Sequence, residues 1–127
     1  MSENIVNKFL VVDDEQDIRE MIECALSSEG HSVSVAADRG EALEMLKTSK
    51  PDIMFLDLAM SGLGIEEFLH EARKISPSTD VVLMTAGYRA ATKAEEFGIS
   101  TYLQKPFELH ALSRSAAAFC NRRATAG

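Results

Sequence analysis

Three short segments of this chain are unbroken runs of apolar side chains, and two others alternate apolar and polar residues. The unbroken runs are residues 9–12, 53–56 and 81–84, and the alternating segments are residues 32–35 and 101–104. An unbroken run of four is typical of a strand covered on both faces, as in a parallel sheet flanked by helices. Alternation is typical of a strand with one less buried face. The pattern therefore predicts three central strands and two edge strands.

Between and after these segments, apolar residues recur at the three- and four-residue spacing of an amphipathic helix. The stripes are Ile18, Met21, Ile22, Ala25 and Leu26; Ala42, Leu43 and Leu46; Ile65, Phe68, Leu69 and Ala72; Ala90, Ala94 and Phe97; and Leu109, Leu112, Ala116 and Phe119. Gly30 follows the first stripe, where a left-handed residue often ends a helix, and Asp38 precedes the second as the expected N-cap. Gly98 ends the fourth stripe, which predicts a short fourth helix.

Strand and helix therefore alternate five times along the chain. This order predicts an α/β fold, a doubly wound sandwich in which helices cover both faces of a parallel sheet. Right-handed crossovers limit the possible topologies. With the three continuous runs in the centre and the alternating strands at the edges, the strand order 2-1-3-4-5 fits.

Length and charge narrow the class of protein. A chain of 127 residues suits one domain, and 46% hydrophobic with 26% charged residues is typical of a globular protein. We expect a single domain over residues 1–127, with a core of about residues 8–121 and short tails. Twenty acidic and 13 basic side chains give a net charge of -7. A nucleic-acid-binding face needs clustered Lys and Arg, so no nucleic-acid partner is expected.

We expect no membrane-spanning segment and no signal peptide. No apolar run approaches the ~20 residues of a membrane-spanning helix, and residues 1–8 lack the apolar stretch of a signal peptide. The two cysteines, Cys24 and Cys120, are too few for a disulfide framework or a zinc site. This favours free thiols in a reducing compartment. We therefore expect a cytoplasmic protein with no membrane partner.

Polar residues with a common chemistry follow four of the predicted strands. Asp13 and Asp14 follow the first, Asp57 the third, Thr85 the fourth and Lys105 the fifth. Ligands of open parallel sheets bind at the carboxyl ends of the strands, near the switch point between the first and third strands. Three carboxylates this close need a counter-charge, and Mg²⁺ prefers oxygen ligands. A carboxylate nucleophile, a metal, a hydroxyl and a lysine are what phosphoryl transfer to an aspartate requires.

The motifs around these residues resemble a known family. Val11–Glu15, Asp57–Met60, Thr85–Ala86 and Tyr102–Phe107 are similar to the receiver domain of two-component response regulators. The resemblance covers roughly residues 8–119. It implies a flavodoxin-like (βα)5 fold with strand order 2-1-3-4-5. It also implies a bacterial signalling protein that catalyses only its own phosphorylation and dephosphorylation, and is not an enzyme with a separate substrate.

The resemblance assigns roles to the residues at the strand ends. Asp57 would accept a phosphoryl group from a phosphohistidine on a sensor histidine kinase or a histidine phosphotransfer protein. Asp14, Asp57 and the backbone carbonyl of Ala59 would bind Mg²⁺ directly, and Asp13 would act mainly through water. Lys105 would pair with the phosphoryl group. Phosphorylation would change the surface that an unidentified downstream protein contacts.

The resemblance also implies a switch, and it is incomplete in one loop. Thr85 and Tyr102 match the pair that rearranges on phosphorylation, and the peptide bond Lys105–Pro106 is expected to be cis. Where the family usually has Met-Pro-Gly-Met-Asp-Gly, residues 60–64 are Met-Ser-Gly-Leu-Gly. Ser61 replaces the proline, and the Asp-Gly pair is reduced to Gly64 or displaced by a one-residue deletion, which bears on the rigidity of the loop.

Two other functions fit parts of the pattern. A haloacid-dehalogenase-like phosphohydrolase shares the aspartate nucleophile, the threonine and the lysine, but it needs an acid two residues after the nucleophile, where this chain has Ala59. A degenerate receiver could act as a phosphorylation-independent protein-binding module or hold a flavin. The intact aspartates and Lys105 argue against it, while the altered loop and the short fourth helix favour it.

Overall fold

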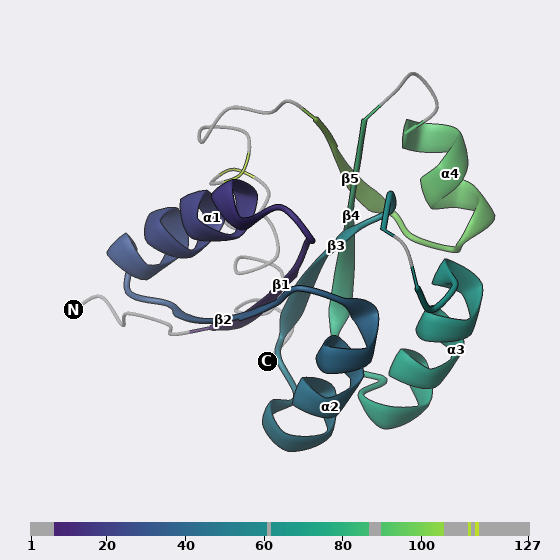
Figure 1. The fold of residues 1–127 in the computed structure, drawn as a ribbon, viewed down its shortest axis with the longest axis horizontal. Helices are drawn as coiled ribbons and strands as arrows, with labels where there is room; N and C mark the ends of the chain where they lie inside the picture. Colours follow the sequence, from purple (N-terminus) through teal and green to yellow (C-terminus); the bar gives the residue numbers. More distant parts are fainter. Residues whose placement is uncertain (1–6, 61, 87–89, 106–111, 113, 115–127) are drawn as a thin grey trace.

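The computed structural model describes residues 7–60, 62–86, 90–105, 112 and 114 (Figure 1). Its elements are β1 Lys8–Val12, α1 Gln16–Ser28, β2 Ser32–Ala36, α2 Arg39–Ser49, β3 Ile53–Asp57, α3 Ile65–Ile75, β4 Asp80–Ala86, α4 Ala90–Glu96 and β5 Thr101–Lys105. All five predicted strands and the first four predicted helices are confirmed. The predicted fifth helix and the Lys105–Pro106 peptide bond lie outside the described residues, apart from the buried Leu112.

The five strands form one parallel sheet in the order β2-β1-β3-β4-β5, which confirms the predicted α/β fold. Every residue of β3 is buried, as is most of β1, whereas β2 and β5 are only partly covered. Unbroken apolar runs therefore did mark the central strands, and alternation marked the edges. Within the described residues, no helix is long and apolar enough to cross a membrane.

Helices cover both faces of the sheet (Figure 1). Leu10 and Val12 of β1 pack with buried residues of α2, α3 and α4 on one face. Phe9 and Val11 point to the other face, where they pack with α1 and with Leu112. Because successive side chains of a strand point to opposite faces, one apolar run contributes to both halves of the core.

Local signals place the helix ends. Gly30, just after α1, has φ +91°, a backbone conformation that suits glycine. The Asp38 side chain accepts a hydrogen bond from the backbone N–H of Glu41 at 2.7 Å, so the predicted N-cap of α2 is confirmed. Glu41 in turn accepts from the backbone N–H of Ala37 at 2.7 Å. The first bond satisfies an N–H group that the first turn of a helix leaves unpaired, and the second holds the segment that enters the helix.

Replacing Asp38 by alanine is expected to lower the free energy of unfolding by about 0.5–2 kcal/mol, the usual value of an N-cap. Equilibrium urea unfolding followed by circular dichroism measures the change. Glu44→Ala is the matched control, because Glu44 is an exposed residue of the same helix and its ion-pair partner, Lys47, is exposed too. We expect the control to change stability by less than about 0.5 kcal/mol. Equal effects of the two substitutions would contradict the capping role of Asp38.

Candidate functional site

Strand ends bring the predicted site residues to one edge of the sheet. Asp57 is the last residue of β3 and Lys105 the last of β5, while Asp13 directly follows β1. The backbone N–H of Asp13 donates to the carbonyl of Ala36 at 3.2 Å, which continues the β1–β2 pairing by one residue. The backbone at this edge is therefore held by the sheet itself, so its side chains start from rigid positions.

Three carboxylates cluster at this edge. One oxygen from each of Asp13, Asp14 and Asp57 lies within 4.8 Å of the others. Asp13 and Asp57 are buried and Asp14 is exposed. The cluster is therefore closed on the side of the sheet and open to solvent beside Asp14.

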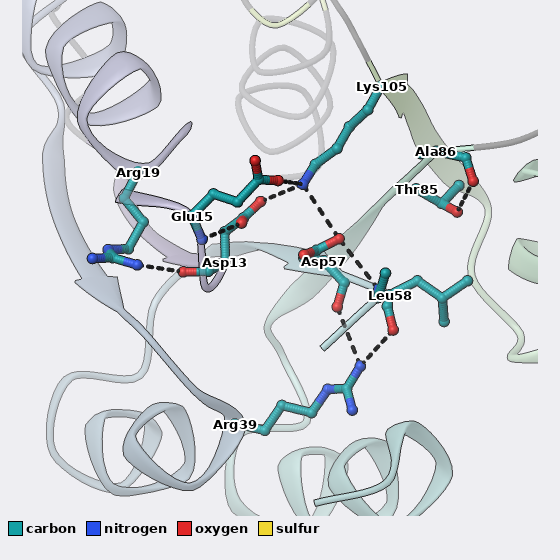
Figure 2. Close-up of polar contacts among 10 residues, drawn as sticks. Asp13, Glu15, Arg19, Arg39, Asp57, Leu58, Thr85, Ala86 and Lys105 are labelled. Carbon is teal, nitrogen blue, oxygen red and sulfur yellow. Dashed lines mark hydrogen bonds and ion pairs between the residues drawn. The ribbon is translucent and has the colours of Figure 1, made fainter. Parts of the chain in front are cut away.

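The Lys105 ammonium lies between the carboxylates of Asp13, Glu15 and Asp57 (Figure 2). Its Nζ is 2.8 Å from Asp13 Oδ2, 3.1 Å from Glu15 Oε1 and 3.4 Å from Asp57 Oδ1. The lysine side chain is only 12% exposed, so these ion pairs are poorly screened by water. Asp13, Asp14, Glu15 and Asp57 outnumber this lysine, and the site has an excess of negative charge.

Burial and neighbouring charges shift the pKa values of Asp57 and Lys105. Burial raises the pKa of Asp57, and the neighbouring Asp13 carboxylate raises it further, against the opposing effects of Lys105 and the Ala59 N–H. Burial alone would lower the pKa of Lys105, but hydrogen bonds to Asp13 and Glu15 and the charges of Asp13 and Asp57 raise it overall. Lys105 therefore stays charged at neutral pH, and Asp57 loses its proton less readily than an exposed aspartate does.

This donor set fits a hard divalent cation. All its ligand atoms are oxygens, which Mg²⁺ prefers, and the carboxylates converge closely enough to share one ion. Asp13 Oδ2 is buried, and within the described residues the Lys105 ammonium at 2.8 Å compensates its charge. A cation here would relieve the repulsion that raises the pKa of Asp57.

The remaining predicted residues lie around the cluster without joining it. Thr85, on β4, is buried, and its hydroxyl donates to the carbonyl of Ala86 at 3.3 Å (Figure 2). Tyr102, on β5, is 42% exposed and pairs with Leu83, two residues before Thr85. The backbone N–H of Ala59 donates to Asp57 Oδ1 at 3.3 Å. The ligand role of the Ala59 carbonyl and the switch roles of Thr85 and Tyr102 stay predictions.

Two arginines that the sequence analysis did not single out contact the backbone of this site. Arg19 of α1 donates to the carbonyl of Asp13 at 2.7 Å. Arg39 of α2 donates to the carbonyls of Asp57 and Leu58 (Figure 2). One signal for Arg39 was present in the sequence, because a cation at the first position of a helix opposes the helix dipole and needs other partners.

Fold and site together define a class: doubly wound α/β proteins with an acidic cluster and a lysine at the carboxyl edge of the sheet. The family model of the response regulator receiver domain matches residues 9–117. The chain therefore belongs to the receiver domain family of two-component response regulators, which confirms the resemblance in the sequence.

Individual relatives agree with this assignment. Response regulator MprA of Mycobacterium avium is 34% identical over 107 residues, which cover 83% of this chain and 47% of that protein. The chain thus spans about half the length of the curated relatives it matches. The solved structure of the chemotaxis protein CheY4 of Vibrio cholerae has a TM-score of 0.81 and 28% identity, covering 91% of this chain and 99% of that one. The solved structure of a response regulator receiver domain protein of Clostridium thermocellum has a TM-score of 0.82 and 28% identity, covering 96% of this chain and 100% of that one.

Proposed function

We propose that this receiver domain is phosphorylated on Asp57, in a Mg²⁺-dependent transfer from a sensor histidine kinase or a histidine phosphotransfer protein. One observation carries the proposal: Asp57 lies within a cluster of three carboxylates, with the Lys105 ammonium 3.4 Å from its Oδ1. An aspartate beside other acids and a lysine, at the edge where the sheet ends, has the partners that phosphoryl transfer needs.

The transfer exchanges one bond to phosphorus for another. An Asp57 carboxylate oxygen attacks phosphorus, the phosphorus–nitrogen bond of the donor phosphohistidine breaks, and the imidazole nitrogen keeps the electron pair and takes up a proton. Lys105 offers its positive charge to the oxygens of the transferred group. Its present bonds to Asp13 and Glu15 hold the ammonium beside the reacting carboxylate. The domain acts on itself in this step and has no separate substrate to turn over.

The Mg²⁺ ligands would be Asp13, Asp14, Asp57 and the backbone carbonyl of Ala59, with Asp13 acting mainly through water. When bound, the cation neutralises the carboxylates and the phosphoryl oxygens as charge develops on them. Exposed Asp14 leaves the site accessible to the cation and to a phosphodonor.

Signalling would follow from Thr85 and Tyr102. Among the described residues, the Thr85 hydroxyl bonds a neighbouring carbonyl at 3.3 Å, so it can exchange this bond for one to a phosphoryl oxygen at small cost. Tyr102 lies on the adjacent strand and is 42% exposed, so a change in its position alters the surface. The output would be a protein–protein contact with a downstream target.

Intact-mass measurement after incubation with acetyl phosphate tests the proposal. With Mg²⁺ we expect the mass gain of one phosphoryl group, and with a chelator no gain. A rapid acid quench at several early times detects a phosphoryl group that is lost quickly by hydrolysis. No gain at any time with Mg²⁺ would overturn the proposal and favour the alternative, a degenerate receiver that binds partners without phosphorylation.

A further inference from the structure

Arg39 is a buried cation in an unfavourable place. It is the first residue of α2, and only 3% of it is exposed. The helix dipole disfavours a positive charge at this position, and burial removes the water that would otherwise solvate it. Burial lowers the pKa of Arg39, while the charge of Asp57 acts in the opposite direction. A guanidinium still remains charged in proteins, so specific contacts must compensate for its burial.

Among the described residues, the hydrogen bonds of Arg39 go to one segment, the end of β3 and its connection to α3. The Arg39 guanidinium donates to the carbonyl of Leu63 at 2.6 Å, to that of Leu58 at 2.8 Å and to that of Asp57 at 3.3 Å. Leu58 and Leu63 stand at the two ends of the stretch between Asp57 and Gly64 (Figure 2 shows the Asp57 and Leu58 bonds). A planar group with several fixed N–H donors can bridge such separated carbonyls, which a single amine cannot do.

The amino-acid sequence of the bridged stretch does little to restrict its backbone. Residues 58–64 contain two glycines and no proline, and Gly62 has φ +95°. Near the site, the N–H of Leu58 donates to the carbonyl of Met84 at 2.8 Å, and the N–H of Met60 donates back to the carbonyl of Leu58 at 3.2 Å. Arg39 adds the long-range bonds that hold both ends of the stretch against α2.

We propose that Arg39 is a positioning residue that fixes the connection after Asp57, so that the Asp57 carboxylate and the adjacent Ala59 carbonyl are held ready for Mg²⁺ and the phosphoryl group. This inference rests on the proposed phosphorylation of Asp57. Arg39 touches neither carboxylate oxygens nor phosphodonor; it acts through the backbone to which the reacting groups belong. A shift of that backbone by an ångström is enough to slow a positioned reaction.

Arg39→Lys tests this role, because it keeps the positive charge but loses the planar guanidinium whose N–H groups bridge the carbonyls. The control is Arg73→Lys: Arg73 of α3 also donates to a backbone carbonyl across elements, that of Phe97 at 2.6 Å, but it is exposed and lies away from the acidic cluster. Two quantities are measured for each variant: the Mg²⁺ dissociation constant by calorimetry, and the phosphorylation rate with acetyl phosphate at saturating Mg²⁺. Circular dichroism establishes that the variants are folded at the assay temperature.

We expect Arg39→Lys to weaken Mg²⁺ binding and to slow phosphorylation at saturating Mg²⁺ by about 10-fold or more, as for other groups that orient metal ligands. Arg73→Lys should match the wild type in both. If Arg39→Lys does not fold, Arg39→Gln replaces it, with the same expectation. A folded Arg39 variant with wild-type Mg²⁺ affinity and rate overturns the inference. If the wild type itself is not phosphorylated, the proposed function fails, and Mg²⁺ affinity alone then decides whether Arg39 positions the site.

Discussion

Replacing Asp57 by asparagine is expected to abolish phosphorylation and, in the absence of Mg²⁺, to make the protein more stable. Asparagine has nearly the same shape but neither attacks phosphorus nor carries charge. It can still accept the hydrogen bond from the Ala59 N–H. It removes a buried charge that faces Asp13, and Lys105 keeps its contacts with Asp13 and Glu15. The gain in unfolding free energy should be roughly 0.5–3 kcal/mol, the usual size of a single-substitution effect.

The pH dependence of this gain follows from the raised pKa of Asp57. The folded protein holds the Asp57 proton more tightly than the unfolded chain, whose carboxyl titrates near its ordinary value of 3.8. The stability that this group contributes is therefore complete below pH 3.8 and is lost as pH rises through the raised pKa. The gain in unfolding free energy of Asp57→Asn should be absent below pH 3.8 and should develop as pH rises through the raised pKa of Asp57. Urea unfolding at several pH values in the presence of a chelator measures it.

In the presence of Mg²⁺, the wild type should become more stable than Asp57→Asn. A ligand that binds only the folded state adds about 2.7 kcal/mol at 100 times its dissociation constant. The variant lacks one of the clustered carboxylates and should gain less. Glu95→Gln is the control, because it removes a charge from an exposed position of α4 and should change neither stability nor phosphorylation. Phosphorylation of Asp57→Asn would mean that another residue is the acceptor.

How far the fold could be predicted depends on burial. All five residues of β3 are buried, so an unbroken apolar run was its direct signature. β4 extends beyond the predicted residues 81–84 in both directions, from Asp80 to Ala86. Asp80 pairs with Ile53 through the backbone, and this pairing needs no apolar side chain. Polar residues at strand ends therefore escape a prediction based on hydrophobicity.

Some contacts of the candidate site could be predicted from the sequence, and others could not. Asp13, Asp14, Asp57 and Lys105 could be predicted to meet, because each follows a strand and parallel strands end at one edge. The contacts of Arg39 could not, since its partners lie 18 to 24 residues further along the chain and are backbone carbonyls, which every residue has. The bond from Thr85 to Ala86 depends on a side-chain rotamer, which residue type does not determine.

Replacing Lys105 by methionine is expected to cost the metal-free protein about 3–5 kcal/mol of unfolding free energy, as when one partner of a buried ion pair is removed. Methionine keeps the length and the apolar stem of the lysine. The Asp13 carboxylate, which is fully buried, would then have lost its 2.8 Å ion pair, and Asp57 its 3.4 Å ion pair. The two acids would face each other with no cation between them.

Two conditions should restore the stability of Lys105→Met. Saturating Mg²⁺ should narrow its deficit relative to the wild type, since a cation bound by Asp13, Asp14 and Asp57 replaces the missing charge. Acid should narrow it too, because protonated carboxyls no longer repel one another. Lys47→Met is the control: it breaks an exposed pair with Glu44 and should cost less than about 1 kcal/mol under all conditions. If Lys105→Met loses no more than this control, the lysine is not the counter-charge of the buried acids, and the electrostatic basis of the site is wrong.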